Sequence, residues 1–376
     1  MTDVQIDDTI YTESTFNERG NTMSSTEKKR NTSFDLLRII SAFSVIMLHA
    51  SGIYLHQYPV GTLGFRLSNF MNSISRFGVP IFVMISGAIF LSETKQISVK
   101  KLWCKNIFRM AVVFGVWSFA YYVYQSLYWW KFDFWRHGLL RTITGCVYAS
   151  DHFWFLFMIM GLYALVPILR TWVHNASQKE LDYFVILFVI FKILHTSLSI
   201  LIDKSLIHEI FNLVKIVELS WYLGYFVLGY ILVRYGVSKR IKIFLYSFVP
   251  IGIAANYLIS DYMSLRQGSY TPGIYDSFGL FTFLHSAALF VFFTDAVSKI
   301  KFPKKIEVLS TNIALDTLGI YLMHVALLDF CETNAFIIGR IPPFPGVILI
   351  SLFCFVVCGI VSGILRRIPF VGKYVC

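Results

Sequence analysis

Charged residues are scarce in this sequence. They make up 15% of its 376 residues, compared with about 25% in ordinary soluble domains, whereas 56% of the residues are hydrophobic. There is no Gly-rich phosphate loop, no zinc-ligand spacing and no Cys-x-x-Cys pair, and the six cysteines do not suggest a disulfide framework. These absences argue against a soluble nucleotide-binding, zinc-binding or disulfide-stapled domain. The surplus of apolar residues instead predicts an all-α integral membrane protein.

The positive net charge does not point to nucleic acid. The formal net charge is +11, but the Lys and Arg residues lie in short loops between apolar segments and do not gather on one soluble face. Aromatic residues, at 17%, suit helix surfaces that face lipid and its interfaces. We therefore expect membrane lipid around the protein, and no nucleic acid.

The apolar runs predict a polytopic protein of about ten transmembrane helices. A polar segment over residues 1–32 precedes them and predicts a disordered cytoplasmic tail, so that residues 33–376 form one transmembrane domain. The predicted spans are 34–54, 76–91, 108–128, 152–170, 182–202, 218–235, 241–260, 278–298, 313–331 and 346–365.

The distribution of Lys and Arg orients these spans. With alternating sides, 22 of these residues fall on the side of the N-terminus and eight on the other, leaving out Arg38, Arg76 and Lys192 in or at the edge of spans. Cytoplasmic loops carry the excess of positive residues. Both termini are therefore predicted to be cytoplasmic, which requires an even number of spans.

The first span carries two polar residues that an ordinary span would avoid. Arg38 and His49 are eleven residues apart, which places them within about 20° of one another and about 16 Å apart along a helix. Ionisable residues inside a membrane usually face the bundle interior and mark a site. The alternative is an arginine that snorkels to the interface and a histidine that bonds a neighbouring helix. Ser33 is the expected N-cap.

Basic residues open the third predicted span from the cytoplasm. Lys101, Lys105 and Arg109 stand four residues apart, with Lys100 beside them. One explanation is that they only determine topology. The other is a binding site for an anionic ligand with several phosphates, which Lys and Arg bind well.

The predicted outer side holds further polar candidates. Asp151 and His152 stand where the fourth span begins, and Glu218 opens the sixth. His152 beside Asp151 is either an oriented base or part of a solvated loop. His285 and His324, taken singly, are more often core histidines than catalysts. A bridge between Cys146 and Cys331, the cysteines on or near this side, stays open.

Several segments resemble the blocks of the membrane-bound acyltransferase 3 family. The first span reads FDLLR, then ten residues, then histidine, and later blocks follow in family order over nearly all of the chain after residue 33. The matching segments are VPIFVMISGAIFL at 79–91, HFWFLFMIMGLYALVPILR at 152–170, WYLGYFVLGYIL at 221–232 and GIYLMH at 319–324. The chain is most similar to stand-alone O-acetyltransferases of that family, which lack a fused esterase-like domain.

The resemblance implies an activity and roles for residues. It implies about ten helices in a bacterial inner membrane, acetyl-CoA as a cytoplasmic acyl donor, no metal, and an acceptor glycan or lipid-linked sugar on the far side. His49 would be the general base or the acyl carrier, and Arg38 would hold the donor together with Lys101, Lys105 and Arg109. Asp151, His152 and Glu218 would face the acceptor. Many members have Arg-x-x-Arg at the start of the third span, whereas this chain has Asn106 three residues before Arg109.

Two other classes of function fit the same residues less fully. Intramembrane Arg and His also suit a transporter or flippase for a small solute or a polysaccharide intermediate. A membrane receptor or scaffold would not need the stripe that joins Arg38 to His49. Turnover of labelled acetyl-CoA by purified protein separates an acyltransferase from both.

Overall fold

The protein is a bundle of long helices. The computed structural model describes residues 31–128, 145–146, 149–201, 221–272, 277–369 and 372, and no strand occurs among these residues. The predicted tail and Glu218 lie outside the described residues. The helical elements are α1 Thr32–Gln57, α2 Leu63–Ile74, α3 Gly78–Phe90, α4 Val99–Lys101, η1 Leu102–Ile107, α5 Phe108–Tyr128, η2 Asp151–Phe153, α7 Trp154–Asn175, α8 Gln178–Phe188, η3 Val189–Leu194, α9 His195–Leu201, α12 Trp221–Arg234, α13 Lys239–Gln267, α14 Leu280–Val291, η4 Phe292–Ala296, η5 Val297–Lys299, α15 Lys304–Thr333 and α16 Pro343–Arg367.

The helices confirm an all-α protein with many membrane spans. Within the described part of the chain, nine helical segments are long and apolar enough to cross a membrane, and Tyr222–Arg234 is a shorter apolar helix. Each falls on a predicted span, so the sequence placed the apolar segments correctly. The sidedness of the termini stays a prediction.

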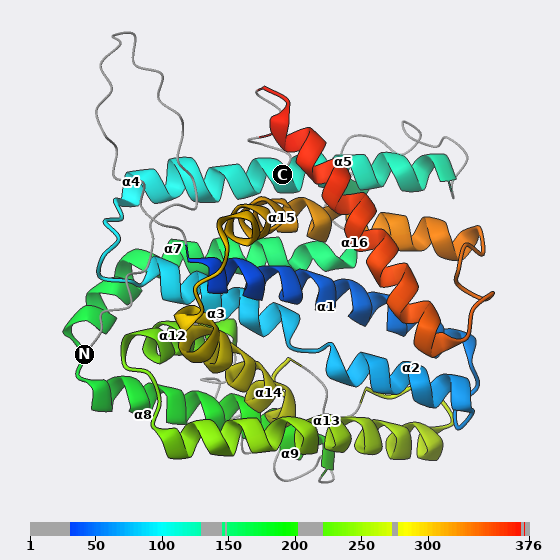
Figure 1. Ribbon diagram of the computed structural model, residues 1–376, viewed down its shortest axis with the longest axis horizontal. Helices are drawn as coiled ribbons and strands as arrows, with labels where there is room; N and C mark the ends of the chain where they lie inside the picture. Colours follow the sequence, from blue (N-terminus) through cyan, green and yellow to red (C-terminus); the bar gives the residue numbers. More distant parts are fainter. Residues whose placement is uncertain are drawn as a thin grey trace.

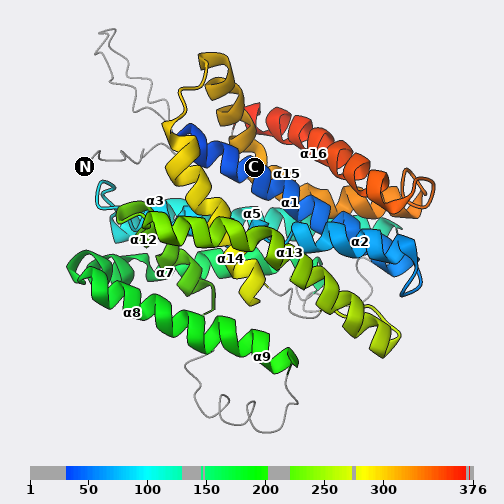
Figure 2. The same ribbon diagram turned by 60° about the horizontal axis from the view of Figure 1, so that its bottom comes forward.

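Helix α1 occupies the middle of the bundle. It packs against α15, α2, α16 and α3, and Figure 1 shows it running lengthwise through the molecule between the other long helices. Figure 2 shows α15 and α16 on one side and α8 with α9 on the opposite side. Polar residues on α1 therefore lie among other helices.

The start of α1 differs from the prediction in one residue. Asn31 is the N-cap, because its side chain accepts hydrogen bonds from the backbone N–H groups of Ser33 and Phe34 at 3.0 and 3.4 Å. Ser33, the predicted cap, lies inside the first turn and donates its hydroxyl to Asn31 at 2.6 Å. Asparagine and serine are equally good caps, so composition did not choose between them.

The second span is longer than predicted and is broken in the middle. It runs over 63–90 instead of 76–91, and α2 and α3 are separated at residues 75–77. The polar residues of α2 hid it from a hydropathy count, but they bond within the bundle: Asn69 donates to Tyr257 O, and Asn72 donates to Leu48 O. The correction moves Arg76 from the end of a span to its midpoint.

Helices α3 and α12 approach through a reciprocal pair of glycines. A Cβ added at Gly87 would lie 1.7 Å from Phe226 O, and one at Gly229 would lie 2.0 Å from Met84 O. Small residues allow backbones to approach closely in membrane bundles, where apolar side chains gain little by leaving lipid. This contact fixes α3, and thus the break before it, against the rest of the bundle.

The described cysteines, including Cys146 and Cys331, are free thiols.

Candidate active site

His49 is exposed on the inner side of α1. Ile40, 37% exposed, stands nine residues earlier, so the two side chains project from opposite faces of the helix, about 180° apart. Ala42 and Val45, which share the face of His49, are buried. Because this face points into the bundle, we infer that the exposed surface of His49 borders an opening between helices.

Three histidines from three helical elements meet at this point. The ring centroid of His324, on α15, lies 5.0 Å from that of His49, and the ring of His152, on η2, lies 5.4 Å from that of His324. His324 is 0% exposed and His152 is 5% exposed. A row of imidazoles thus begins at the exposed His49 and continues into the protein.

The protonation of His324 follows from one hydrogen bond. Its Nδ1 lies 2.6 Å from the carbonyl oxygen of Tyr321, and a carbonyl can only accept, so Nδ1 carries the proton. In the neutral ring, Nε2 then carries the basic lone pair. That atom is buried and has no hydrogen-bond partner among the described residues, and the same is true of His152 Nε2. Unsatisfied buried polar atoms are rare and call for an explanation.

Tyrosines hold the backbone around these rings. The hydroxyl of Tyr321 donates to His152 O, and that of Tyr121 donates to Leu322 O at 2.8 Å. Ala326 N in turn donates to the Tyr121 oxygen at 3.0 Å. Tyr121 and Tyr321 therefore join α5, η2 and α15 at the level of the histidines.

A buried polar cluster holds Arg76 beside His49. Asn72 donates from its amide nitrogen to Leu48 O at 3.1 Å and to Ser51 Oγ at 2.9 Å, both on α1. The Asn72 amide oxygen accepts from Arg76 Nε at 3.0 Å, and Arg76 Nη2 also donates to Tyr270 Oη at 3.2 Å. Both of these partners are uncharged side chains at the break of the span. Sequence reasoning set Arg76 aside as an edge residue.

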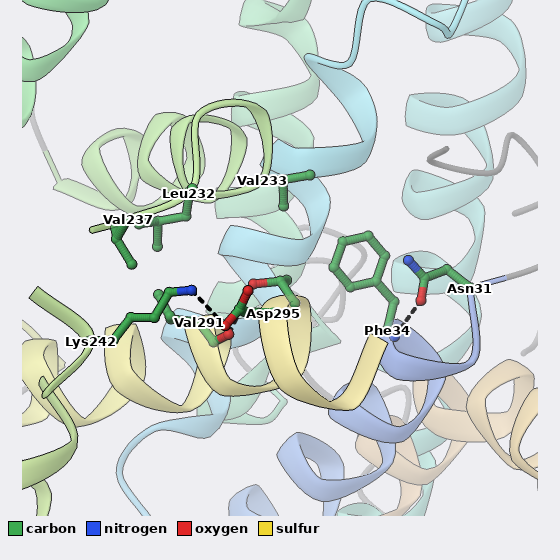
Figure 3. A pocket seen from close by; sticks show the side chains of 10 residues that line it. Asn31, Phe34, Leu232, Val233, Val237, Lys242, Val291 and Asp295 are labelled. Carbon is green, nitrogen blue, oxygen red and sulfur yellow. Dashed lines mark hydrogen bonds and ion pairs between the residues drawn. The ribbon is translucent and has the colours of Figure 1, made fainter. Parts of the chain in front are cut away.

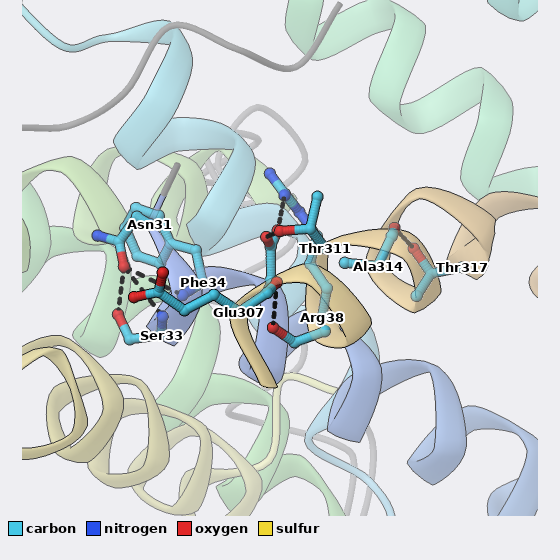
Figure 4. A network of polar contacts seen from close by, with 10 residues as sticks. Asn31, Ser33, Phe34, Arg38, Glu307, Thr311, Ala314 and Thr317 are labelled. Atoms are coloured by element: carbon cyan, nitrogen blue, oxygen red, sulfur yellow. Dashed lines mark hydrogen bonds and ion pairs between the residues drawn. The ribbon is translucent and has the colours of Figure 1, made fainter. Parts of the chain in front are cut away.

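Arg38 belongs to a network that joins α1 to α15. Its Nη1 donates to Asp35 Oδ1 at 3.2 Å, and Asp35 Oδ2 accepts from Thr311 Oγ1 at 3.0 Å. The side chain of Asp35 is 1% exposed and that of Arg38 is 14% exposed. Figure 4 shows this network between the start of α1 and α15. Since α1 is continuous, Arg38 and His49 keep the shared face predicted for them.

The basic residues of the third span lie on a separate helix. Lys101 is exposed, while Lys105 and Arg109 are half-buried, and a π-helical turn at Leu102–Ile107 contains Lys105. This turn packs against α7. Met110, which follows Arg109, belongs to the same hydrophobic cluster as Val45, on the face of α1 that carries Arg38 and His49. The fold thus brings the start of α5 near the segment of α1 between Arg38 and His49.

A pocket lies where α1 begins and α12 ends. Figure 3 shows its apolar lining, with the Lys242 ammonium directed at Asp295. The two groups are 2.6 Å apart, and Asp295 also pairs with Lys299. The charge of Lys242 is compensated, so this pocket does not resemble a phosphate site. Its lining residues are Asn31, Phe34, Leu232, Val233, Gly236, Val237, Lys242, Val291, Thr294 and Asp295.

The outer candidates divide between the site and the surface. Asp151 is exposed, whereas the His152 ring lies beside Ser150, whose Oγ is 2.6 Å from His152 Nδ1. Of the two alternatives for His152, a solvated loop does not fit its 5% exposure, and no hydrogen bond to Asp151 orients its ring among the described residues. His152 instead joins His324, which the sequence had suggested to be a core histidine.

Comparison with known protein families agrees with the resemblance found in the sequence. The model of the acyltransferase 3 family, described as an acyltransferase domain, matches residues 31–363. No curated protein and no solved structure matches the chain. The match covers nearly all of the described helices, and the helices are those of a multi-pass membrane protein. The chain belongs to the acyltransferase 3 family and is a membrane acyltransferase.

Proposed function

We propose that the protein transfers an acetyl group from cytoplasmic acetyl-CoA to a hydroxyl group of an extracytoplasmic glycan or lipid-linked sugar, in a bacterial cytoplasmic membrane. His49 is the reacting histidine, and Arg38, Lys101, Lys105 and Arg109 bind the donor. No metal takes part in this proposal.

The exposure of His49 inside the bundle is the observation that carries the proposal. A histidine that only stabilised the bundle would be bonded, as His174 is: its side chain is also exposed, but its Nε2 lies 2.8 Å from Leu91 O. His49 is exposed and has no hydrogen-bond partner among the described residues. A base must be free to meet its substrate, and His49 is.

The chemistry needs one group that takes up and returns a proton. The acceptor oxygen attacks the thioester carbonyl, its O–H bond breaks, and His49 takes the proton. The carbon–sulfur bond then breaks, and His49 gives the proton to the leaving thiolate of coenzyme A. The products are the acetyl ester and the free thiol. If His49 instead carries the acetyl group, the same bonds break in two steps.

The donor end needs cations at the cytoplasmic rim. Coenzyme A bears phosphates, and charge-assisted hydrogen bonds from Lys and Arg to phosphate are strong. Lys101, Lys105 and Arg109 share a face, because they are spaced four residues apart. Met110 and Val45 belong to one hydrophobic cluster, which supports a path for the donor from this rim to His49, along the face of α1 that carries Arg38.

Vesicles of defined orientation test the proposal. Membranes with the chain are prepared inside-out and right-side-out and given radiolabelled acetyl-CoA, which does not cross lipid. We expect label in the glycolipid fraction, and free coenzyme A, from inside-out vesicles alone. Label from right-side-out vesicles alone contradicts the cytoplasmic donor. Intact acetyl-CoA in both preparations, when an unmodified solute crosses the membrane, supports the transporter and overturns the proposal.

A further inference from the structure

His324 is a buried histidine that the reaction described above does not use. Its ring is 0% exposed, and its centroid lies 5.0 Å from that of His49. Its Nδ1 proton is committed to Tyr321 O, and its basic Nε2 has no partner in the described part of the chain. In a membrane bundle, polar side chains normally find partners. The vacant nitrogen beside the exposed histidine is therefore the feature to explain.

We infer that His324 is a positioning residue, which accepts a hydrogen bond from His49 through Nε2 during the reaction. This inference rests on the proposed function of His49. Two imidazoles joined by a hydrogen bond of about 3 Å have centroids about 5 Å apart, so a small rotation of the His49 ring closes the contact. The described structure already holds the two rings at this separation.

Such a contact would set the tautomer of His49. A neutral imidazole has one N–H and one lone pair. If the N–H points to His324, the lone pair must face the opening, where the acceptor hydroxyl arrives. When His49 takes the acceptor's proton, the resulting cation donates more strongly to His324 Nε2 and is stabilised by it. The proton remains on His49 until the thiolate takes it, so the balance of the reaction does not change.

The hydrogen bond to Tyr321 makes this arrangement possible. A freely rotating histidine could present either N–H or lone pair to His49. Nδ1–H of His324 is held by a carbonyl of its own helix, so Nε2 is the acceptor. A base oriented by a third group is the general pattern of activated catalytic histidines.

Two substitutions at the same position separate positioning from packing. In His324→Gln, the side-chain oxygen can occupy the place of Nε2 and still accept from His49. In His324→Asn, the amide can occupy the place of Nδ1 and still donate to Tyr321 O, but nothing reaches His49. A merely structural histidine would be replaced better by asparagine, and a positioning histidine better by glutamine.

The test measures acetyl transfer by purified wild type, His324→Gln, His324→Asn and His49→Gln, each checked for a single species by size exclusion. We expect kcat to fall by about 10- to 100-fold in His324→Asn and much less in His324→Gln, because misplacing a catalytic group by an ångström costs about that factor. KM for acetyl-CoA should stay near wild type in both. Equal kcat values, or a better asparagine variant, overturn the inference.

The remaining variant keeps the inference separate from the proposed function. An active His49→Gln protein means that the proposed function of His49 fails. An inactive His49→Gln protein together with a fully active His324→Asn protein means that His49 reacts without His324. If both His324 variants fail to fold, His324→Ala with added imidazole replaces them: recovery of kcat supports positioning, and a folded protein without recovery contradicts it.

Discussion

The two polar regions of α1 both contain ionisable side chains, but their hydrogen-bonding groups are in opposite states. At the N-terminal end, Arg38 pairs with Asp35, which also accepts from Thr311, so these groups bond to one another. In the other half, His49 is exposed, and the nearby Nε2 of His324 has no partner among the described residues. In the first region, a hydrogen-bond network links α1 to α15. In the second, hydrogen-bonding capacity is left unused among the described residues.

This difference decides how each region responds to mutation. Removing a group from a satisfied buried network disturbs folding, because it deprives its partner of compensation. Removing a group that has no partner disturbs only what that group does. The sequence alone gave Arg38 and His49 equal standing as site residues. The structure indicates that only His49 can be tested by simple removal.

The largest effect is expected for His49→Gln. Glutamine keeps the size of the side chain and cannot shuttle a proton, so transfer should fall by about 10²- to 10⁴-fold. Stability should stay close to wild type, because no described hydrogen bond is lost. The measurements are initial rates of acetyl transfer and the thermal unfolding midpoint in detergent. His174→Gln is the control, since that side chain can still bond Leu91 O, and it should keep its activity. Near-normal transfer by His49→Gln contradicts the assignment.

The next largest effect is on stability. Arg38→Ala leaves the buried Asp35 without the charge of its described partner, and breaking a buried ion pair costs about 3–5 kcal/mol. We expect a large drop in the midpoint of denaturant unfolding. Adding Asp35→Asn removes the cost of burying an unpaired carboxylate, so it should restore most of the lost stability. A stable Arg38→Ala protein would show that the network does not stabilise the packing of α1 against α15.

The same pair of variants isolates the donor role of Arg38. Acetyl-CoA affinity is measured in the double variant and compared with Asp35→Asn alone. If Arg38 also binds phosphate, its loss should weaken binding by about tenfold or more, since hydrogen bonds to charged groups contribute about 1.5–3 kcal/mol. Equal affinities of the two variants for acetyl-CoA would mean that Arg38 serves only to link α1 to α15.

The sequence predicted what a single helix determines and missed what contacts between helices determine. Arg38 and His49 share a face because the helical period fixes it, and α1 is unbroken. His324 seemed a core residue, since nothing in its own span shows that His49 lies 5.0 Å away. Arg76 was set aside because the polar side chains of α2 lower the hydropathy of its span. Asn72 shows the reason: its amide nitrogen donates to two oxygen atoms on α1, and hydropathy does not count such bonds.

A smaller effect is expected when the opening beside His49 is narrowed. Gly52 lies one turn beyond His49, and a Cβ added there meets nothing within 4 Å. Gly52→Ala should therefore be tolerated. Gly52→Phe should hinder a bulky glycan while water or a short alcohol still reaches the acetyl group. We expect the ratio of glycan transfer to hydrolysis to fall by about tenfold, which corresponds to 1.4 kcal/mol. An unchanged ratio would place the acceptor elsewhere.

The smallest effect is expected at the exposed end of the donor site. Lys101 is exposed, and an exposed ion pair contributes about 0.2–1 kcal/mol, so Lys101→Ala should raise KM for acetyl-CoA by at most about fivefold. The increase should shrink at high salt, because salt screens exposed charges, and kcat should not change. Lys100→Ala is the matched control, since it removes the same charge one position away, off the face that Lys101 shares with Lys105 and Arg109. If the two variants raise KM equally, the basic residues act only as a diffuse positive field and not as a phosphate site. That result would leave the contrast between the two halves of α1 intact, because it depends on Arg38 and His49 and on no residue of the third span.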